Sequence, residues 1–174
     1  MFNPLTDSLP SEWRGAIIKT DFKQALKVFK TLAEKDIEQQ ERSLLIIGAL
    51  FEKIPDDCTD LWDFVNYYLS GGNTKENEPG PRVFDFNVDA GRVYAAFRQV
   101  YNIDLRNESM HWWIFLELFK ALPRGTHLSE VIEIRGKKIT KNMDDESKRQ
   151  LRKAQRAYRI DQDSRTDWRS FLGG

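Results

Sequence analysis

Residues 110–122 read Met110-His-Trp-Trp-Ile-Phe-Leu-Glu-Leu-Phe-Lys-Ala-Leu122, and this stretch decides the fold because it is apolar almost all the way round a helix. At about 100° per residue, its only polar positions are His111, Glu117 and Lys120. Glu117 and Lys120 lie within roughly one sixth of the circumference, and His111 points to the opposite side. A helix that is apolar on nearly every side is buried on nearly every side. We therefore expect a central helix that other helices surround.

The residues around the paired tryptophans form the expected core. Trp112 and Trp113 are about 100° apart on a helix, so their indoles face different neighbours. His111 stands among bulky apolar residues, which favours a hydrogen-bonded core histidine over a metal ligand or a general base. The predicted core residues are His111, Trp112, Trp113, Phe115, Phe119, Tyr94 and Phe97.

Apolar residues at helical spacing predict three helices in the first part of the chain, at residues 20–36, 38–53 and 59–70. Thr20 is the expected N-cap of the first helix. Gly71 and Gly72 are expected to end the third helix as a left-handed C-terminal cap.

Two more helices are predicted on either side of the central one, at about 89–101 and 127–135. Asp89 or Asn87 is the expected cap of the earlier helix, and Asn102 closes it in a left-handed conformation. Thr126 is the expected cap of the later helix.

The fold class that follows is all-α: a compact helical domain of about six helices around a central buried helix, with a basic C-terminal helical arm. No alternating strand pattern of useful length appears in the sequence. The predicted body covers residues 1–140 and contains a polar, turn-rich linker at 72–82. The arm and tail cover residues 141–174. The apolar central stretch is too short to span a bilayer, which takes about 20 residues, so no membrane is expected.

The net charge of zero hides an uneven distribution of charge along the chain. Residues 1–134 carry 15 Lys/Arg against 21 Asp/Glu, whereas residues 135–160 carry 10 against 3. An acidic body joined to a basic arm has three explanations that the sequence leaves open. The arm is solvated, it folds onto its own acidic body, or it meets a separate acidic partner.

The arm itself is predicted to be a helix that begins near Asn142 and has a thin apolar stripe of Leu151, Ala154 and Tyr158. Such a helix is marginal alone and gains its stability from a docking surface. Apolar residues near the end of the polar tail suggest a further docking point. The predicted partner-binding residues are Lys148, Arg149, Arg152, Lys153, Arg156, Arg159, Trp168 and Phe171.

Motifs for catalysis or cofactor binding are absent from the sequence, including a nucleophile elbow, a phosphate-binding glycine loop, a dinucleotide fingerprint and zinc-type Cys/His spacing. An acidic group at residues 56–63 offers ligands for a hard cation, but its simpler role is to cap and charge the beginning of a helix. Cys58 is alone, so no intramolecular disulfide forms, and no export signal is recognisable. We therefore expect a cytoplasmic protein without enzymatic activity, cofactor or metal.

Nucleic acid is the other candidate partner for a basic helix. Six basic side chains would contact phosphates and give binding with a steep salt dependence. The acidic body would repel the same polyanion, however, and no aromatic residues are interleaved with the basic stripe. We therefore expect a protein partner rather than nucleic acid.

Several motifs between Asp85 and Arg135 resemble those of one known family. The motifs are Asp85-Phe-Asn-Val-Asp-Ala-Gly-Arg-Val-Tyr-Ala-Ala-Phe97, Tyr101-Asn-Ile-Asp-Leu105, His111-Trp-Trp-Ile-Phe115, Leu122-Pro-Arg-Gly-Thr126 and Ile132-Glu-Ile-Arg135. They resemble the tailed-phage "gene product fifteen" family, and a looser likeness reaches back through Ile18-Lys-Thr-Asp-Phe22. Family members often carry glycine where this chain has Asn102. The region after about Lys141 matches mainly as a charged tail.

The resemblance implies a role in phage tails rather than a reaction. The family has no established enzymatic activity, and its members are encoded among the tail genes of long-tailed phages and prophages, commonly just before the tape-measure gene. This position implies a tail assembly chaperone in the host cytoplasm that binds tape-measure and tail-tube proteins. Two alternatives stay open: a minor structural tail protein retained in the virion, and a small DNA-binding regulatory protein that uses the basic arm.

Overall fold

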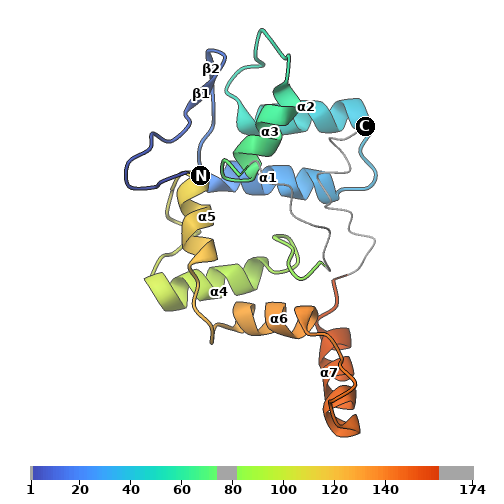
Figure 1. Ribbon diagram of the computed structural model, residues 1–174. Coiled ribbons are helices and arrows are strands. Elements are labelled where there is room, and N and C mark those ends of the chain that lie inside the picture. Colours follow the sequence, from blue (N-terminus) through green and yellow to red (C-terminus); the bar gives the residue numbers. More distant parts are fainter. Residues whose placement is uncertain (1, 74–81, 161–174) are drawn as a thin grey trace. The chain divides into compact units, whose positions relative to one another are not determined.

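The computed structural model describes residues 2–73 and 82–160, and within them seven helices and one small antiparallel pair of strands (Figure 1). The predicted all-helical class is confirmed, since the strands are two residues each. No helix among the described residues is long and apolar enough to cross a membrane.

The described residues divide into two compact units. Unit 1 comprises residues 2–73 and 107–121, and unit 2 comprises 82–106 and 122–160. Unit 1 holds β1 (Glu12–Trp13), β2 (Ala16–Ile17), α1 (Phe22–Ala33), α2 (Gln39–Leu50), α3 (Leu61–Leu69) and α5 (Trp112–Lys120). Unit 2 holds α4 (Ala90–Tyr101), α6 (His127–Gly136) and α7 (Asp145–Ala157). The basic helix α7 thus groups with α4 and α6 in unit 2.

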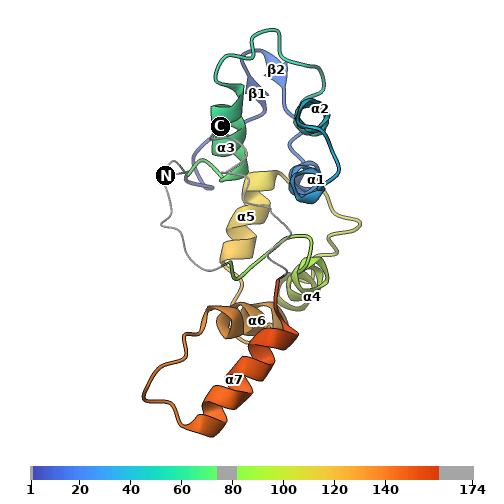
Figure 2. The same ribbon diagram turned by 90° about the vertical axis from the view of Figure 1, so that its right-hand side faces the viewer.

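The helices α1 and α2 lie side by side in unit 1, as both views of the ribbon show (Figures 1 and 2). The strands β1 and β2 are joined by Arg14 and Gly15, which both have positive φ, as a two-residue type I′ hairpin turn requires. Trp13 of this hairpin stacks on Phe64 of α3 with ring centroids 5.0 Å apart. Strands this short leave no alternating pattern in the sequence, which is why the sequence did not predict them.

The beginning of α1 differs from the prediction. Its N-cap is Asp21, whose carboxylate accepts from the backbone N–H of Lys23 at 2.8 Å, and not Thr20. The carbonyl of Thr20 instead accepts from the backbone N–H of Trp112 at 2.8 Å. Thr20 therefore belongs to a short extended pairing between the segments that precede α1 and α5, a contact that local sequence rules do not contain.

The helix ends that depend on local residues agree with the prediction. Gly71 and Gly72 follow α3 with φ of +71° and +78°, and Asn102 closes α4 with φ of +55°. Thr126 caps α6 by accepting from the backbone N–H of Ser129 at 3.1 Å. The helix α7, predicted to begin near Asn142, begins at Asp145, and its cap is Asp144, whose side chain accepts from the backbone N–H of Ser147.

Candidate interaction surface

The predicted central helix is α5, which is shorter than residues 110–122 because His111 has extended backbone and acts as its N-cap. The imidazole Nδ1 of His111 accepts from the backbone N–H of Trp113 at 3.1 Å, and Nε2 lies 3.0 Å from the carbonyl of Pro10. The ring is half-buried, and this burial lowers the pKa of His111 below its usual 6.5. It serves as a helix cap that ties the N-terminal segment to α5.

The paired tryptophans hold α5 to the end of α3. The indole Nε1 of Trp112 donates to the carbonyl of Leu69 at 3.1 Å, and that of Trp113 donates to the carbonyl of Tyr68 at 2.8 Å. These carbonyls belong to the last turn of α3, where carbonyl groups have no N–H partner within the helix. Gly72 makes room for the second indole: a Cβ there would lie 2.9 Å from Cη2 of Trp113.

The other predicted core residues vary in burial. Phe115 and Phe97 are fully buried, while Phe119 and Tyr94 are partly exposed. Phe115 stacks on Phe22 of α1 with centroids 4.8 Å apart. This contact lies within unit 1.

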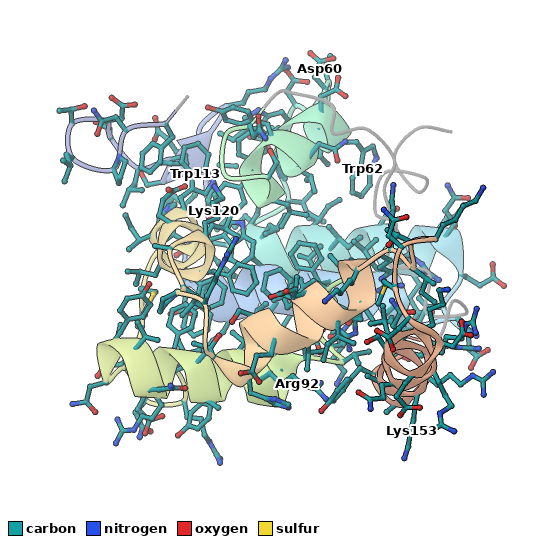
Figure 3. All side chains as sticks on the ribbon, turned by 60° about the horizontal axis from the view of Figure 1, so that its bottom comes forward. Asp60, Trp62, Arg92, Trp113, Lys120 and Lys153 are labelled. Atoms are coloured by element: carbon teal, nitrogen blue, oxygen red, sulfur yellow. The ribbon has the colours of Figure 1, made fainter. Side chains whose placement is uncertain are left out.

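The predicted partner-binding residues on α7 lie on its exposed side. Arg149, Arg152, Lys153 and Arg156 are exposed and Lys148 is partly exposed, as is clear for Lys153 in Figure 3. Arg159, just after the helix, is exposed as well. Trp168 and Phe171 lie outside the described residues.

Part of this positive charge is neutralised within α7. Lys148 pairs with Asp145 at 3.3 Å, and Arg149 pairs with Glu146 at 2.5 Å. The acidic residues that pair belong to the first turn, where they also suit the helix dipole. Arg152, Lys153 and Arg156 form no ion pair among the described residues, so the uncompensated charge is concentrated in the second half of the helix.

The opposite side of α7 docks on α6. Leu151 is buried, and the side-chain amide of Gln155 donates to the carbonyls of Ile134 and Lys137 at 3.0 and 2.8 Å. Those carbonyls lie at the C-terminal end of α6, whose last carbonyl groups lack partners within their own helix. Gln155 therefore caps α6 and fixes α7 against it at the same time.

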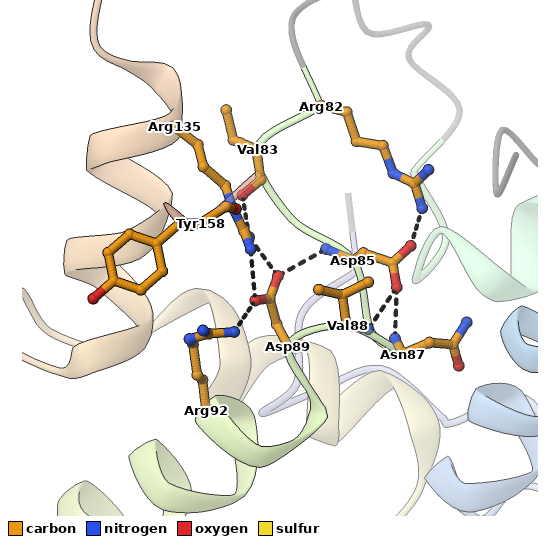
Figure 4. Close-up of polar contacts among 9 residues, drawn as sticks. All are labelled: Arg82, Val83, Asp85, Asn87, Val88, Asp89, Arg92, Arg135 and Tyr158. Atoms are coloured by element: carbon orange, nitrogen blue, oxygen red, sulfur yellow. Dashed lines mark hydrogen bonds and ion pairs between the residues drawn. The ribbon is translucent and has the colours of Figure 1, made fainter. Parts of the chain in front are cut away.

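A buried ion pair joins the last turn of α6 to the residue that precedes α4 (Figure 4). The guanidinium of Arg135, in the last turn of α6, binds the carboxylate of Asp89 with N–O distances of 2.6 and 3.1 Å. The side chains of Arg135 and Asp89 are only 5% and 0% exposed. Arg135 also donates from Nε to the carbonyl of Tyr158 at 2.6 Å and from Nη1 to the carbonyl of Val83 at 3.1 Å.

The segment before α4 shares the network. Asp89 accepts from Arg92 at 2.8 Å and from the backbone N–H of Asp85 at 3.1 Å. Asp85 pairs with Arg82 and accepts from the backbone N–H groups of Asn87 and Val88. Asp89 stands at the N-cap position of α4, as predicted, but its carboxylate caps no backbone N–H of that helix.

Sequence reasoning missed Asp89, Arg135 and Gln155 as the residues that position α7. Asp89 and Arg135 are 46 residues apart, and each looks like an ordinary charged residue at a helix end. The available signal was their presence in two of the motifs that carry the family resemblance, Asp85–Phe97 and Ile132–Arg135.

The acidic group near α3 has a structural role in unit 1. The guanidinium of Arg14 pairs with Asp57 and Asp60, and Asp57 accepts from the backbone N–H of Thr59 at 2.8 Å. The hydrogen bond from Thr59 is the main reason that the pKa of Asp57 lies below its usual value. Among the described residues no group of three or more His, Cys, Asp or Glu side chains could hold a metal ion.

Comparison with known proteins identifies one relationship. A family model described as bacteriophage Gp15 protein matches residues 5–160, which is most of the chain. The comparison with curated proteins gives no match, and neither does the comparison with solved structures.

Proposed function

Because this chain belongs to the bacteriophage Gp15 protein family, we propose that it is a non-enzymatic tail morphogenesis protein, most specifically a tail assembly chaperone that binds tape-measure or tail-tube protein in the host cytoplasm. The family match over residues 5–160 is the observation that carries this proposal. The family itself suggests a phage structural or morphogenesis protein. The tail assembly chaperone role and the two tail-protein partners are our proposal.

The arrangement of α7 supports a binding role. Its apolar and amide side chains are used for docking on α6, and its uncompensated cations point outward. A charged surface on an anchored helix can hold a partner through several weak, salt-sensitive contacts. Such contacts suit a chaperone, since it must release its partner when the tail is assembled.

The first test is co-expression with the tape-measure and tail-tube proteins of the same phage, followed by affinity capture at low and at moderate salt. We expect capture of at least one of the two, with more captured at low salt because exposed charges are screened as ionic strength rises. Capture of neither protein at either salt concentration would contradict the proposal.

The second test separates an assembly factor from a virion component. A chaperone should be present in infected cells and absent from purified virions when both are analysed by mass spectrometry. Its recovery from virions in a constant ratio to the tail-tube protein would instead identify a minor structural tail protein.

A further inference from the structure

The exposed cations of α7 form a single stripe on one side of the helix. Arg149, Arg152, Lys153 and Arg156 have the spacing i, i+3, i+4 and i+7, which places them within roughly 100° of the circumference. Their stripe is about 10 Å long at 1.5 Å per residue. It lies away from Leu151, the buried residue of α7.

The helix that carries the stripe, α7, cannot rotate easily about its own axis. Gln155 is held by two carbonyls at the end of α6, and the carbonyl of Tyr158 accepts from the buried guanidinium of Arg135. These contacts fix both the position and the rotation of α7 within unit 2. The cations are therefore a preorganised pattern, which lowers the entropic cost of binding a partner with a matching pattern.

From this pattern we infer that α7 is the docking surface for an acidic helix of a partner protein, with carboxylates at the same spacing of three and four residues. This inference names the chemistry of the partner in the function proposed above and rests on it. A partner helix places three or four carboxylates along about 10 Å, whereas one face of an extended strand places about two, since same-face residues are roughly 6.8 Å apart. Three cations of α7 form no ion pair with a carboxylate among the described residues: Arg152, Lys153 and Arg156. Three free cations match the three or four carboxylates of a helix better than the two of a strand.

Nucleic acid fits the same surface less well. The side chain of Asp145 is fully exposed and lies about 20° from Arg152 around the helix, so it stands at one end of the stripe. A duplex carries a charge about every 1.7 Å and would bring phosphates against this carboxylate.

The first arm of the test uses the complete chain and the captured tail protein. In the variant Arg152→Glu/Arg156→Glu, capture should fall at least tenfold, while Arg152→Lys/Arg156→Lys retains it. The matched control is Lys27→Glu/Lys30→Glu on the exposed side of α1, which changes the net charge equally. Equal capture by both charge-reversed variants would overturn the inference and leave the proposed function standing.

The second arm does not need a tail protein, so it judges the inference even where the parent chain captures none. The probes are a helical alanine-based peptide with glutamates at i, i+3, i+4 and i+7, a peptide of the same composition with the glutamates spread around the helix, and a 20-base-pair DNA duplex. Fluorescence anisotropy should show tighter binding of the striped peptide, lost in Arg152→Glu/Arg156→Glu. Equal binding of the two peptides, or tighter binding of the duplex, would overturn the inference.

Discussion

Arg135 and Asp89 form a buried ion pair with two N–O contacts of 2.6 and 3.1 Å, in which neither side chain is more than 5% exposed. The same guanidinium reaches the carbonyl of Tyr158 at the end of α7. One pair of side chains therefore joins the beginning of α4, the end of α6 and the end of α7. The surface that α7 presents depends on a contact that is itself inaccessible to a partner.

Arg135→Ala should lower the free energy of unfolding of unit 2 by about 3–5 kcal/mol, because it leaves the Asp89 carboxylate buried without its main partner. Chemical denaturation followed by circular dichroism measures the loss. Asp89→Ala should cost a similar amount, since it leaves a buried guanidinium. The double variant should cost less than the two single costs added together, because each removes the same interaction.

The matched control for the ion pair is Lys120→Ala. Lys120 and Glu117 form an exposed pair on α5 at 2.8 Å, with side chains 54% and 39% exposed. Surface pairs contribute about 0–1 kcal/mol, so this variant should unfold almost like the parent. Equal effects of Lys120→Ala and Arg135→Ala would show that the buried pair contributes no more than a surface one.

Glycine at position 72 is expected to be essential for the packing of Trp113. Gly72→Ala forces a side chain into a backbone with φ of +78° and places a Cβ 2.9 Å from the indole. The left-handed backbone costs about 1–2 kcal/mol, and displacement of a packed ring about 1–3 kcal/mol more. Thermal unfolding and the tryptophan fluorescence of the folded protein should both change.

Two other glycines separate the causes of this loss. Gly125 has φ of +91° with no atom within 4 Å of an added Cβ, so Gly125→Ala should show the backbone cost alone. Gly48 lies in α2 with equally open space and no positive φ. Gly48→Ala should stabilise the protein by up to about 1 kcal/mol, because alanine is the better helix former. If Gly72→Ala behaves like Gly125→Ala, close packing against Trp113 is not the reason for glycine.

The sequence predicted those features that depend on residues close together in the chain. The left-handed Asn102 and the capping Thr126 are local features of a helix end, and both appear in the structure. Helical periodicity likewise placed the seven helices of residues 2–73 and 82–160 within a few residues of their observed bounds.

The features that escaped prediction depend on distant residues. Thr20 satisfies every local rule for an N-cap, yet its carbonyl pairs with Trp112 and the cap moves to Asp21. Asp89 and Arg135 similarly find each other only in the folded unit. A single sequence does not show which distant residues pair. Charged residues at helix ends are therefore predicted to be solvated.

The stability of unit 1 should decrease when the pH falls below about 6.5. Burial holds the pKa of His111 in the folded state below its ordinary value of 6.5, so the unfolded chain binds more protons in that window. The stabilisation is complete above about 6.5 and is lost as the pH falls toward the lower folded pKa. The slope for one group cannot exceed about 1.4 kcal/mol per pH unit.

Denaturation measured between pH 7.5 and 5.5 tests this dependence on His111. His111→Asn keeps an oxygen that can cap α5 but removes the titrating ring, so its stability should change less over this range. His127→Asn is the matched control, because the His127 side chain is 56% exposed. The response of the control should equal that of the parent, and an unchanged slope in His111→Asn would assign the pH response to other groups.

Truncation after Thr140 tests whether α7 is an independent arm or part of unit 2. If α7 were an arm attached to a complete body, its removal would leave the unfolding transition unchanged. The burial of Leu151, the hydrogen bonds of Gln155 to the end of α6 and the hydrogen bond of Arg135 to the carbonyl of Tyr158 predict otherwise. Removal exposes apolar surface and leaves Arg135 Nε and the end of α6 without their partners, so the loss should reach about 2–4 kcal/mol.

Gln155→Ala in the complete chain should produce about 1–2 kcal/mol of that loss, whereas Gln150→Ala, on an exposed position of the same helix, should produce almost none.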